Sequence, residues 1–417
     1  MLFFLKKSIK QKVNTGNENF NIYKFLTNTF ICSALHTSLI SCVLIPYFTF
    51  SGMLPLQISI IVTIKRLVRF IGDTFFGFIF DRFGAKIVFI TGRLMKLSTY
   101  FILLFNNSFI VLCISMCIYG LSEGTIQGKV SSFMYNNLRA NNKLSSFSKA
   151  MSMYYLVIDI HIALMSFLAG IVLKQYGYNV VLYISILTNI FSLYLLIKLI
   201  PSKSQNNLNQ FVAKSFKDIV LTTKMVFQKN HLFAYLIALY GVLVFFAWQF
   251  GSVASMILLD MGMDGTGVAM MGSTVKICMA IGTLIPIFII KNTISLKRIS
   301  VFLTILILFG TITSLSYNLY LFCIFMILVD ICYVSLEVSL EKNLETLSDK
   351  TIRGTAISLA MTFCSVVAVI SNLSVGFLAQ YFNFKIAMMS IFAIMLLLSL
   401  FLTYKVILLT KKSRKYE

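Results

Sequence analysis

Long apolar stretches, each about the length of a membrane-crossing helix, alternate with short polar intervals along the chain. A helix needs about 20 mainly apolar residues to cross the hydrocarbon core of a bilayer. The chain shows no two-residue alternation of the kind that marks a transmembrane β-strand. The pattern therefore predicts an all-α membrane protein with twelve spanning helices, numbered here as spans 1 to 12: residues 23–48, 56–80, 85–105, 109–135, 147–173, 179–199, 231–259, 267–291, 297–316, 319–342, 354–380 and 385–409.

The longest polar interval between spans divides the chain into two halves of six spans each. We predict an N-terminal half over 1–200, a cytoplasmic linker over 201–230 and a C-terminal half over 231–417. From Phe211 onward the linker is either an amphipathic helix on the membrane surface or a plain solvated segment.

A weak internal repeat relates the two halves. Asn137-Leu138 recurs as Asn343-Leu344 at an offset of 206 residues, and both pairs close an even-numbered span. Parallel halves of six spans around a site at the bilayer midplane are a known transporter architecture. The repeat therefore favours two pseudo-symmetric six-helix bundles.

Composition and charge support a multi-pass membrane protein. The chain is 58% hydrophobic and 12% charged with a mean hydropathy of +0.88, whereas soluble domains carry about 25% charged residues. With the N-terminus in the cytoplasm, 27 Lys and Arg lie on the cytoplasmic side and two on the opposite side. This bias predicts cytoplasmic termini. The net charge of +22 then meets anionic lipid head groups rather than nucleic acid.

The sequence gives no sign of an enzyme or of a cofactor. It has neither a phosphate-binding loop of Walker type nor metal-ligand spacing among its eight cysteines, which we interpret as small apolar side chains. No cleavable signal peptide is evident. We expect a monomer in the plasma (inner) membrane of a bacterium.

A compact charged turn, GFIFDRFGAK, separates spans 2 and 3. Gly84 permits a tight reversal, and Gly77 allows two helices to approach closely. Asp81 lies at the membrane edge, where a carboxylate gains from the dipole of a helix N-terminus. Arg82 and Lys86 add positive charge on the cytoplasmic side.

That turn resembles the G-x-x-x-D-R-x-G-R-K signature of the major facilitator superfamily, with Ala85 at a usually basic position. The segment IRGTAISLAMTF, from Ile352, is similar to the start of span 11 in that superfamily. The resemblance implies a secondary transporter in which Asp81 meets the start of span 11 near Arg353 and latches the cytoplasmic side closed. The alternative is a basic turn that only fixes topology.

Ionisable residues inside the predicted spans are candidates for a binding site, since a charge at the bilayer centre costs about 2.5–3.5 kcal/mol. In span 2, Lys65, Arg69 and Asp73 recur every four residues on one helix face. Arg69 and Asp73 either pair with each other or lock span 2 to a neighbour. Lys65 and Arg66 are also placed to extend toward the membrane surface.

Spans 1, 4 and 5 add further candidates. Glu123 lies near the middle of span 4, among glycines that repeat every four residues and suit close helix packing. In span 5, Asp159 and His161 point about 200° apart on a helix. We favour Asp159 for the cavity. His161, and His36 in span 1, are more often hydrogen-bonded packing residues.

Span 10 carries an acidic stripe, Asp330, Glu337 and Glu341, on one helix face. Lys276 in span 8 is a possible counter-charge. Under the 206-residue offset, Glu123 maps within one position of Asp330, so the two halves place carboxylates at nearly matched sites.

In span 7, Gln249 lies between Trp248 and Phe250, which permits an adaptable aromatic pocket. The sequence predicts no metal site.

A buried carboxylate that exchanges a proton for a substrate is a transport mechanism. The first interpretation is proton-coupled export of a drug-like compound or metabolite. Uptake of a small polar nutrient is the second, and a non-transporting membrane sensor or assembly partner is an alternative of another class. Two departures weaken export: Met116 stands where proton antiporters often have arginine, and span 5 lacks a Gly-Pro pair. Whether Arg69, Arg93 or Lys129 replaces that arginine stays open.

Overall fold

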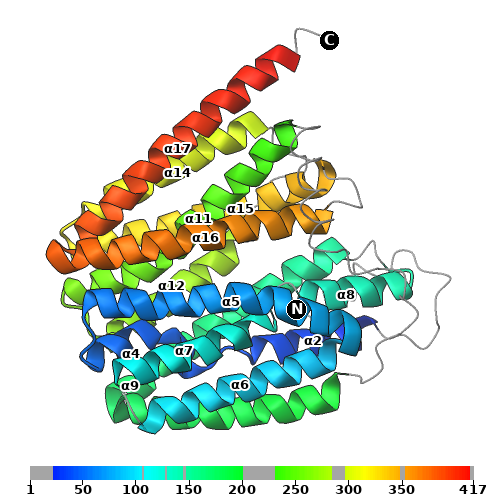
Figure 1. Cartoon of the computed structure of the whole chain (residues 1–417), viewed down its shortest axis with the longest axis vertical. Coiled ribbons are helices and arrows are strands. Elements are labelled where there is room, and N and C mark those ends of the chain that lie inside the picture. Colours follow the sequence, from blue (N-terminus) through cyan, green and yellow to red (C-terminus); the bar gives the residue numbers. More distant parts are fainter. Residues whose placement is uncertain are drawn as a thin grey trace. The chain divides into compact units, whose positions relative to one another are not determined.

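The computed structural model describes residues 22–105, 108–126, 129–143, 147–200, 231–283, 296–347 and 353–413. In these ranges every regular element is a helix (Figure 1). The helices are α2 (Ile22–Ala34), α3 (Leu39–Cys42), α4 (Leu44–Phe50), α5 (Pro55–Phe83), α6 (Ala85–Phe105), α7 (Phe109–Gly124), α8 (Lys129–Ala140), α9 (Phe147–Leu199), α11 (His231–Asp260), α12 (Gly265–Gly282), α14 (Leu296–Ser314), α15 (Leu319–Leu347), α16 (Arg353–Tyr381) and α17 (Phe384–Ser413).

The chain forms two compact units. Unit 1 contains Met1–Cys42 and Val68–Leu208, and unit 2 contains Val43–Leu67 and Asn209–Glu417. The boundary passes through α5, so the N-terminal part of this helix packs with the C-terminal helices. Sequence order alone assigns that part to the first half.

Unit 1 is built on the long helix α9. Its two arms meet at Gly177, which has a φ of 76° that glycine adopts more readily than other residues. Helices α2, α3 and α6 pack against α9, and α7 packs against α6. The core between them is rich in aromatic rings, with Phe89 and Phe133 in edge contact at 6.1 Å between centroids.

Unit 2 is built around α11, which contacts α14, α15, α16 and α17. Phe250 is fully buried in this core and stacks on Phe246 at 5.7 Å and on Phe392 at 6.0 Å between centroids. The structure thus gives Phe250 a packing role, not the place in an open aromatic pocket that the sequence permitted. The side chain of Trp248 lies outside the described residues.

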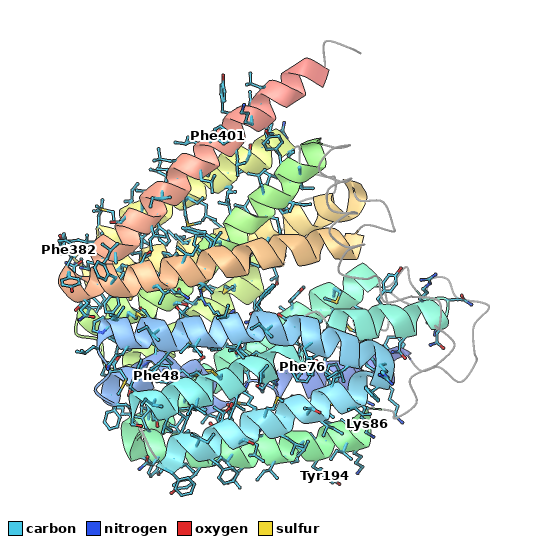
Figure 2. The ribbon with its side chains drawn as sticks, viewed as in Figure 1. Phe48, Phe76, Lys86, Tyr194, Phe382 and Phe401 are labelled. Atoms are coloured by element: carbon cyan, nitrogen blue, oxygen red, sulfur yellow. The ribbon has the colours of Figure 1, made fainter. Side chains whose placement is uncertain are left out.

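Several helices confirm the membrane-spanning character of the chain. By length and composition, six helical segments of the described ranges are long and apolar enough to cross a bilayer: Ala85–Phe105, Met153–Leu199, Ala234–Asp260, Leu296–Ser314, Leu319–Glu337 and Phe384–Leu408. Large apolar side chains such as Tyr194 and Phe401 are exposed on these segments (Figure 2). Extensive exposed apolar surface of this kind suits contact with lipid.

Two predicted spans are not continuous helices. Span 1 is interrupted after Ala34 and again at Val43, so it forms α2, α3 and α4. Span 4 is interrupted after Gly124, so it forms α7 and α8. Hydropathy located these two spans but not their interruptions, because it reports burial and not where the backbone hydrogen bonds end. The possible surface helix from Phe211 lies outside the described residues.

Candidate functional site

Two ion pairs join span 2 to span 4 in unit 1. Arg69 of α5 lies 3.3 Å from the carboxylate of Glu123 at the end of α7. Lys129, the first residue of α8, lies 3.1 Å from the carboxylate of Asp73 and donates to its backbone carbonyl at 2.7 Å. Arg69 and Asp73 therefore have partners on span 4, as expected of residues that lock span 2 to a neighbour.

The ion pairs lie on either side of the break in span 4. Thr125 follows the last residue of α7, and its hydroxyl donates to the carbonyl of Ser122 at 2.7 Å. Glu123 precedes the break and Lys129 follows it. Interrupted helices in transporters expose backbone groups and charges at the binding site. The break makes this the strongest candidate site in unit 1.

Glycine brings the two backbones together beside these pairs. A Cβ added at Gly124 would lie 2.8 Å from the backbone N of Asp73 and from the carbonyl carbon of Gly72. At Gly77 no described atom lies within 4 Å of an added Cβ. Among the described residues, the close helix approach in unit 1 is therefore made at Gly124, and the role expected for Gly77 stays a prediction.

Alanine substitution at these two glycines tests the packing. Gly124→Ala is expected to lower the melting temperature and transport activity, because the new methyl group meets backbone atoms that have little room to move. Overpacking of this kind costs about 1–3 kcal/mol. Gly77→Ala, a matched change in unit 1, is expected to leave both unchanged. Thermal unfolding of purified protein gives the comparison, and equal melting temperatures for the two variants would contradict the assignment.

Buried cations of α6 terminate the first helix of span 1. Arg93 donates to the backbone carbonyls of Cys32 and, at 3.1 Å, Leu35. Lys96 donates to the carbonyl of His36 at 2.6 Å. Each cation is 1% exposed. A helix C-terminus has free carbonyls and partial negative charge, which a cation satisfies. This gives Arg93 and Lys96 a structural role at the end of α2.

The candidate residues of span 5 also lie near this break. His161 of α9 places Nε2 3.2 Å from the carbonyl oxygen of Thr37, so it makes the hydrogen bond expected of a packing residue. Asp159, two residues earlier, is buried. His36 contributes its backbone carbonyl to the interrupted segment.

A group of hydroxyls near the same break was not predicted. Tyr119 of α7 donates to Ser41 at 2.9 Å, and Tyr100 of α6 lies 3.2 Å from Ser41 and closer still to Ser38. The Lys96 ammonium is 4.8 Å from the Tyr119 ring centroid. Single Ser and Tyr residues in apolar stretches carry no sequence signal, so only the folded chain reveals this group.

The charged candidates of span 10 lie in unit 2. Asp330 on α15 is 7% exposed, whereas Glu337 is half-buried. Helix α12, which carries half-buried Lys276, packs closely on α15, since a Cβ at Gly282 would lie 3.1 Å from the carbonyl oxygen of Ile331. The side chain of Glu341 lies outside the described residues.

A second polar group of unit 2 joins α5 to α11 and α16. Arg66 donates to Ser252 at 2.6 Å and to Asn372 at 3.3 Å. Gln249 donates to Ser371, and its Nε2 lies 3.4 Å from the carbonyl oxygen of Ala368. Gln249 was predicted as a site residue. The sequence analysis expected Arg66 to extend toward the membrane surface. The structure corrects this, because its guanidinium hydrogen-bonds to two neighbouring helices.

The charged turn between spans 2 and 3 is partly described. Gly84 has a φ of 87°, which confirms the tight reversal. Lys86 donates to the carbonyl of Ile197 at 2.7 Å near the C-terminus of α9 (labelled in Figure 2), and Arg82 is exposed. The side chains of Asp81 and Arg353 lie outside the described residues, so the latch stays a prediction.

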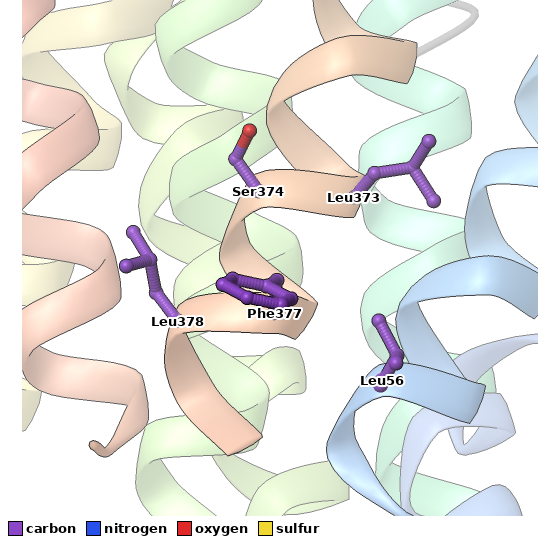
Figure 3. A pocket seen from close by; sticks show the side chains of 5 residues that line it. All are labelled: Leu56, Leu373, Ser374, Phe377 and Leu378. Atoms are coloured by element: carbon purple, nitrogen blue, oxygen red, sulfur yellow. The ribbon is translucent and has the colours of Figure 1, made fainter. Parts of the chain in front are cut away.

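A shallow hollow of about 500 Å³ lies beside the second polar group. Figure 3 shows its lining, with one residue from α5 and four from α16: Leu56, Leu373, Ser374, Phe377 and Leu378. Only Ser374 is polar, so the hollow offers little to orient a hydrophilic solute.

Comparison with known proteins shows which family has this arrangement of helices. The profile of the Major Facilitator Superfamily matches residues 26–293, which include both interrupted spans and the charged turn. The chain belongs to the major facilitator superfamily.

Solved structures of similar fold are also transporters. Their sequence identity to this chain is low, so the likeness shows the fold alone. A crystal structure of a mutant nucleoside transporter NupG superposes with a TM-score of 0.69 at 14% identity, over 92% of this chain and 98% of that one. A POT family transporter in complex with 5-aminolevulinic acid gives 0.67 at 11% identity, over 92% and 96%. These matches confirm a major facilitator fold for this multi-pass membrane protein.

A curated relative is an uncharacterized transporter of Buchnera aphidicola subsp. Schizaphis graminum. It is 30% identical over 163 residues, and the matched region spans 38% of each chain. Membership of the superfamily implies a small-molecule substrate. The profile match extends from α2 into α12 and so includes Glu123, Arg69 and Gln249.

Proposed function

We propose that this superfamily member is a proton-coupled secondary transporter that moves a small polar solute by alternating access. The observation that carries the proposal is the pair of Arg69 with Glu123 at the interruption of span 4. A partly buried carboxylate beside a broken helix is placed to exchange a proton and to alter the packing of that helix when it does.

Protonation of Glu123 would remove one charge from the contact between α5 and α7. Arg69 would then lose its ion-pair partner, and its hydrogen bond to the carboxyl oxygen would become weaker. Lys129 and Asp73, on the other side of the break, hold α8 to α5 through a separate pair. Loss of one pair while the other persists would bias how span 4 bends at the break, which is the differential interaction that a conformational shift requires.

The polar groups inside the two units favour a hydrophilic solute. Unit 1 offers hydroxyls at Ser41 and Tyr119, and unit 2 offers amides and a guanidinium around Gln249 and Arg66. Well-placed polar groups of this kind orient a ligand by hydrogen bonds. A drug-like compound would use the apolar hollow, which has only Ser374 to orient it.

Transport into liposomes tests the proposal. Purified protein is reconstituted, a pH difference is imposed, and uptake and release of radiolabelled solutes are followed together with proton movement. Nucleosides and 5-aminolevulinic acid are the first probes, because transporters of similar fold carry or bind them. Solute flux that moves protons and ceases without the pH difference is expected, and the direction of the flux separates import from export. Flux that is indifferent to the pH difference would contradict proton coupling.

A further inference from the structure

We infer that a group of polar residues in unit 2, the Arg66 cluster, binds a carboxylate of the transported solute. The cluster consists of Thr63, Arg66, Gln249, Ser252 and Asn372. The inference deepens the proposed function, because it assigns a substrate class to a transporter whose coupling residue, Glu123, lies in unit 1.

Hydrogen bonds assemble the cluster from three helices. The two branches of the Arg66 guanidinium reach Ser252 on α11 and Asn372 on α16. Gln249 precedes Ser252 by three residues, so both lie on one face of α11. Gln249 in turn bonds Ser371, the neighbour of Asn372. Arg66 and Gln249 therefore bridge the same pair of helices, one turn apart.

Three polar atoms of the cluster have no hydrogen-bond partner in the described part of the chain. They are Thr63 Oγ1, Gln249 Oε1 and Asn372 Nδ2, on side chains whose residues are 6%, 1% and 4% exposed. Buried side-chain polar atoms are nearly always paired with protein or water. Each unpaired atom costs about 1–3 kcal/mol. Three of them, one on each of the three helices that Arg66 connects, indicate a site that a polar ligand completes.

The residues of the cluster lie well inside their helices, away from the helix ends. Arg66 follows the start of α5 at Pro55, and Gln249 and Asn372 precede the ends of α11 and α16. At a rise of 1.5 Å per residue, each lies about 14–16 Å from that end of its helix. This is half the thickness of a bilayer core of about 30 Å.

The polar groups of the Arg66 cluster match a carboxylate with a neighbouring donor. The Arg66 fork and the Asn372 amide present N–H groups, which carboxylate oxygens accept. The Gln249 carbonyl oxygen accepts from an N–H or O–H group, and the Thr63 hydroxyl serves either partner. A cationic solute would meet the guanidinium charge. The class is therefore a small amino or hydroxy acid.

Thermal unfolding of the purified full-length chain tests this class with matched probes. Lactate, alanine and succinate are each compared with a counterpart in which an amide replaces every carboxylate, namely lactamide, alaninamide and succinamide. Binding to the folded state stabilises by mass action. At least one acid is expected to raise the melting temperature by several degrees at about tenfold excess over its dissociation constant, while its amide has no effect. No response to any acid, or equal responses to acid and amide, would overturn the inference.

Variants locate the response. Asn372→Leu and Gln249→Leu remove unpaired polar atoms but keep similar volume, so both are expected to fold and to lose the acid-dependent shift. Ser374→Ala is the control, since this exposed residue of α16 donates only to the carbonyl of Ile370 among the bonds described. A shift that persists in Asn372→Leu would place the acid elsewhere, and unpaired atoms would then be satisfied by water alone.

Glu123→Gln separates this inference from the proposed function. It is expected to keep the acid-dependent stabilisation, because Glu123 lies in unit 1. If acids bind to the cluster but no proton accompanies transport, the proposed proton coupling is wrong and the inference about the Arg66 cluster remains supported. If proton-driven transport occurs without any acid-dependent shift, the cluster inference fails and the proposed coupling stands.

Discussion

Glu123→Gln is expected to abolish proton-driven transport in liposomes while the protein stays folded and inserted. Glutamine keeps the shape and one hydrogen bond to Arg69, which lies 3.3 Å from the carboxylate, but it has no proton to exchange. The negative charge that pairs with Arg69 is lost, while a hydrogen bond from its guanidinium can persist. Transport per folded molecule is measured with and without a pH difference, so that lower expression is not mistaken for lost coupling.

Two further variants sharpen this result. Asp330→Asn is expected to give the same loss, since Asp330 is buried and maps within one residue of Glu123 across the repeat. Asp260→Asn, at the exposed end of α11, is the control and should transport normally. A normal rate in both Glu123→Gln and Asp330→Asn would remove these carboxylates from the mechanism.

Exchanging the two charges distinguishes a proton site from a structural pair. In the double variant Arg69→Glu with Glu123→Arg, an ion pair re-forms between α5 and α7 with the acid on the other helix. We expect this variant to fold more stably than either single change, yet to transport without normal coupling. Full recovery of proton-driven transport would show that the pair serves packing alone.

Arg93→Met is expected to destabilise unit 1 strongly. Methionine retains the apolar volume of the side-chain stem but leaves the carbonyl oxygens of Cys32 and Leu35 without their donor. Each buried carbonyl left unpaired costs about 1–3 kcal/mol. The melting temperature of the purified protein is expected to fall by about 2–4 °C for each kcal/mol lost.

The matched control is Arg139→Met on α8, where the arginine is exposed and its loss should change the melting temperature little. Arg93→Lys should recover part of the stability, because one ammonium can serve a carbonyl but cannot reproduce the two branches of a guanidinium. If Arg93→Met melts as the native chain does, Arg93 does not hold the end of α2.

The role of a residue could be predicted from the sequence where its near neighbours in the chain determine that role. It could not be predicted where contacts with distant residues determine it. The tight turn at Gly84 followed from its immediate neighbours and was confirmed. The close helix approach at Gly124 was not singled out for this contact, because it depends on which helices cross there. Arg66 carried no signal beyond its charge, since Ser252 and Asn372 lie far from it in sequence.

The sequence by itself determined the membrane class, the all-α character and the superfamily. Burial in lipid demands long apolar helices, which are visible as contiguous apolar residues. The charged turn around Gly84 and Lys86 is likewise a local motif. Only the tertiary structure decided where spans 1 and 4 break and which charges meet. Arg93 replaces the lost backbone donors at the end of α2, and Arg69 and Lys129 complete pairs beside the end of α7. Such breaks are stable only where a distant side chain hydrogen-bonds to the backbone groups that the break leaves unpaired. Hydropathy does not show which residue is that partner.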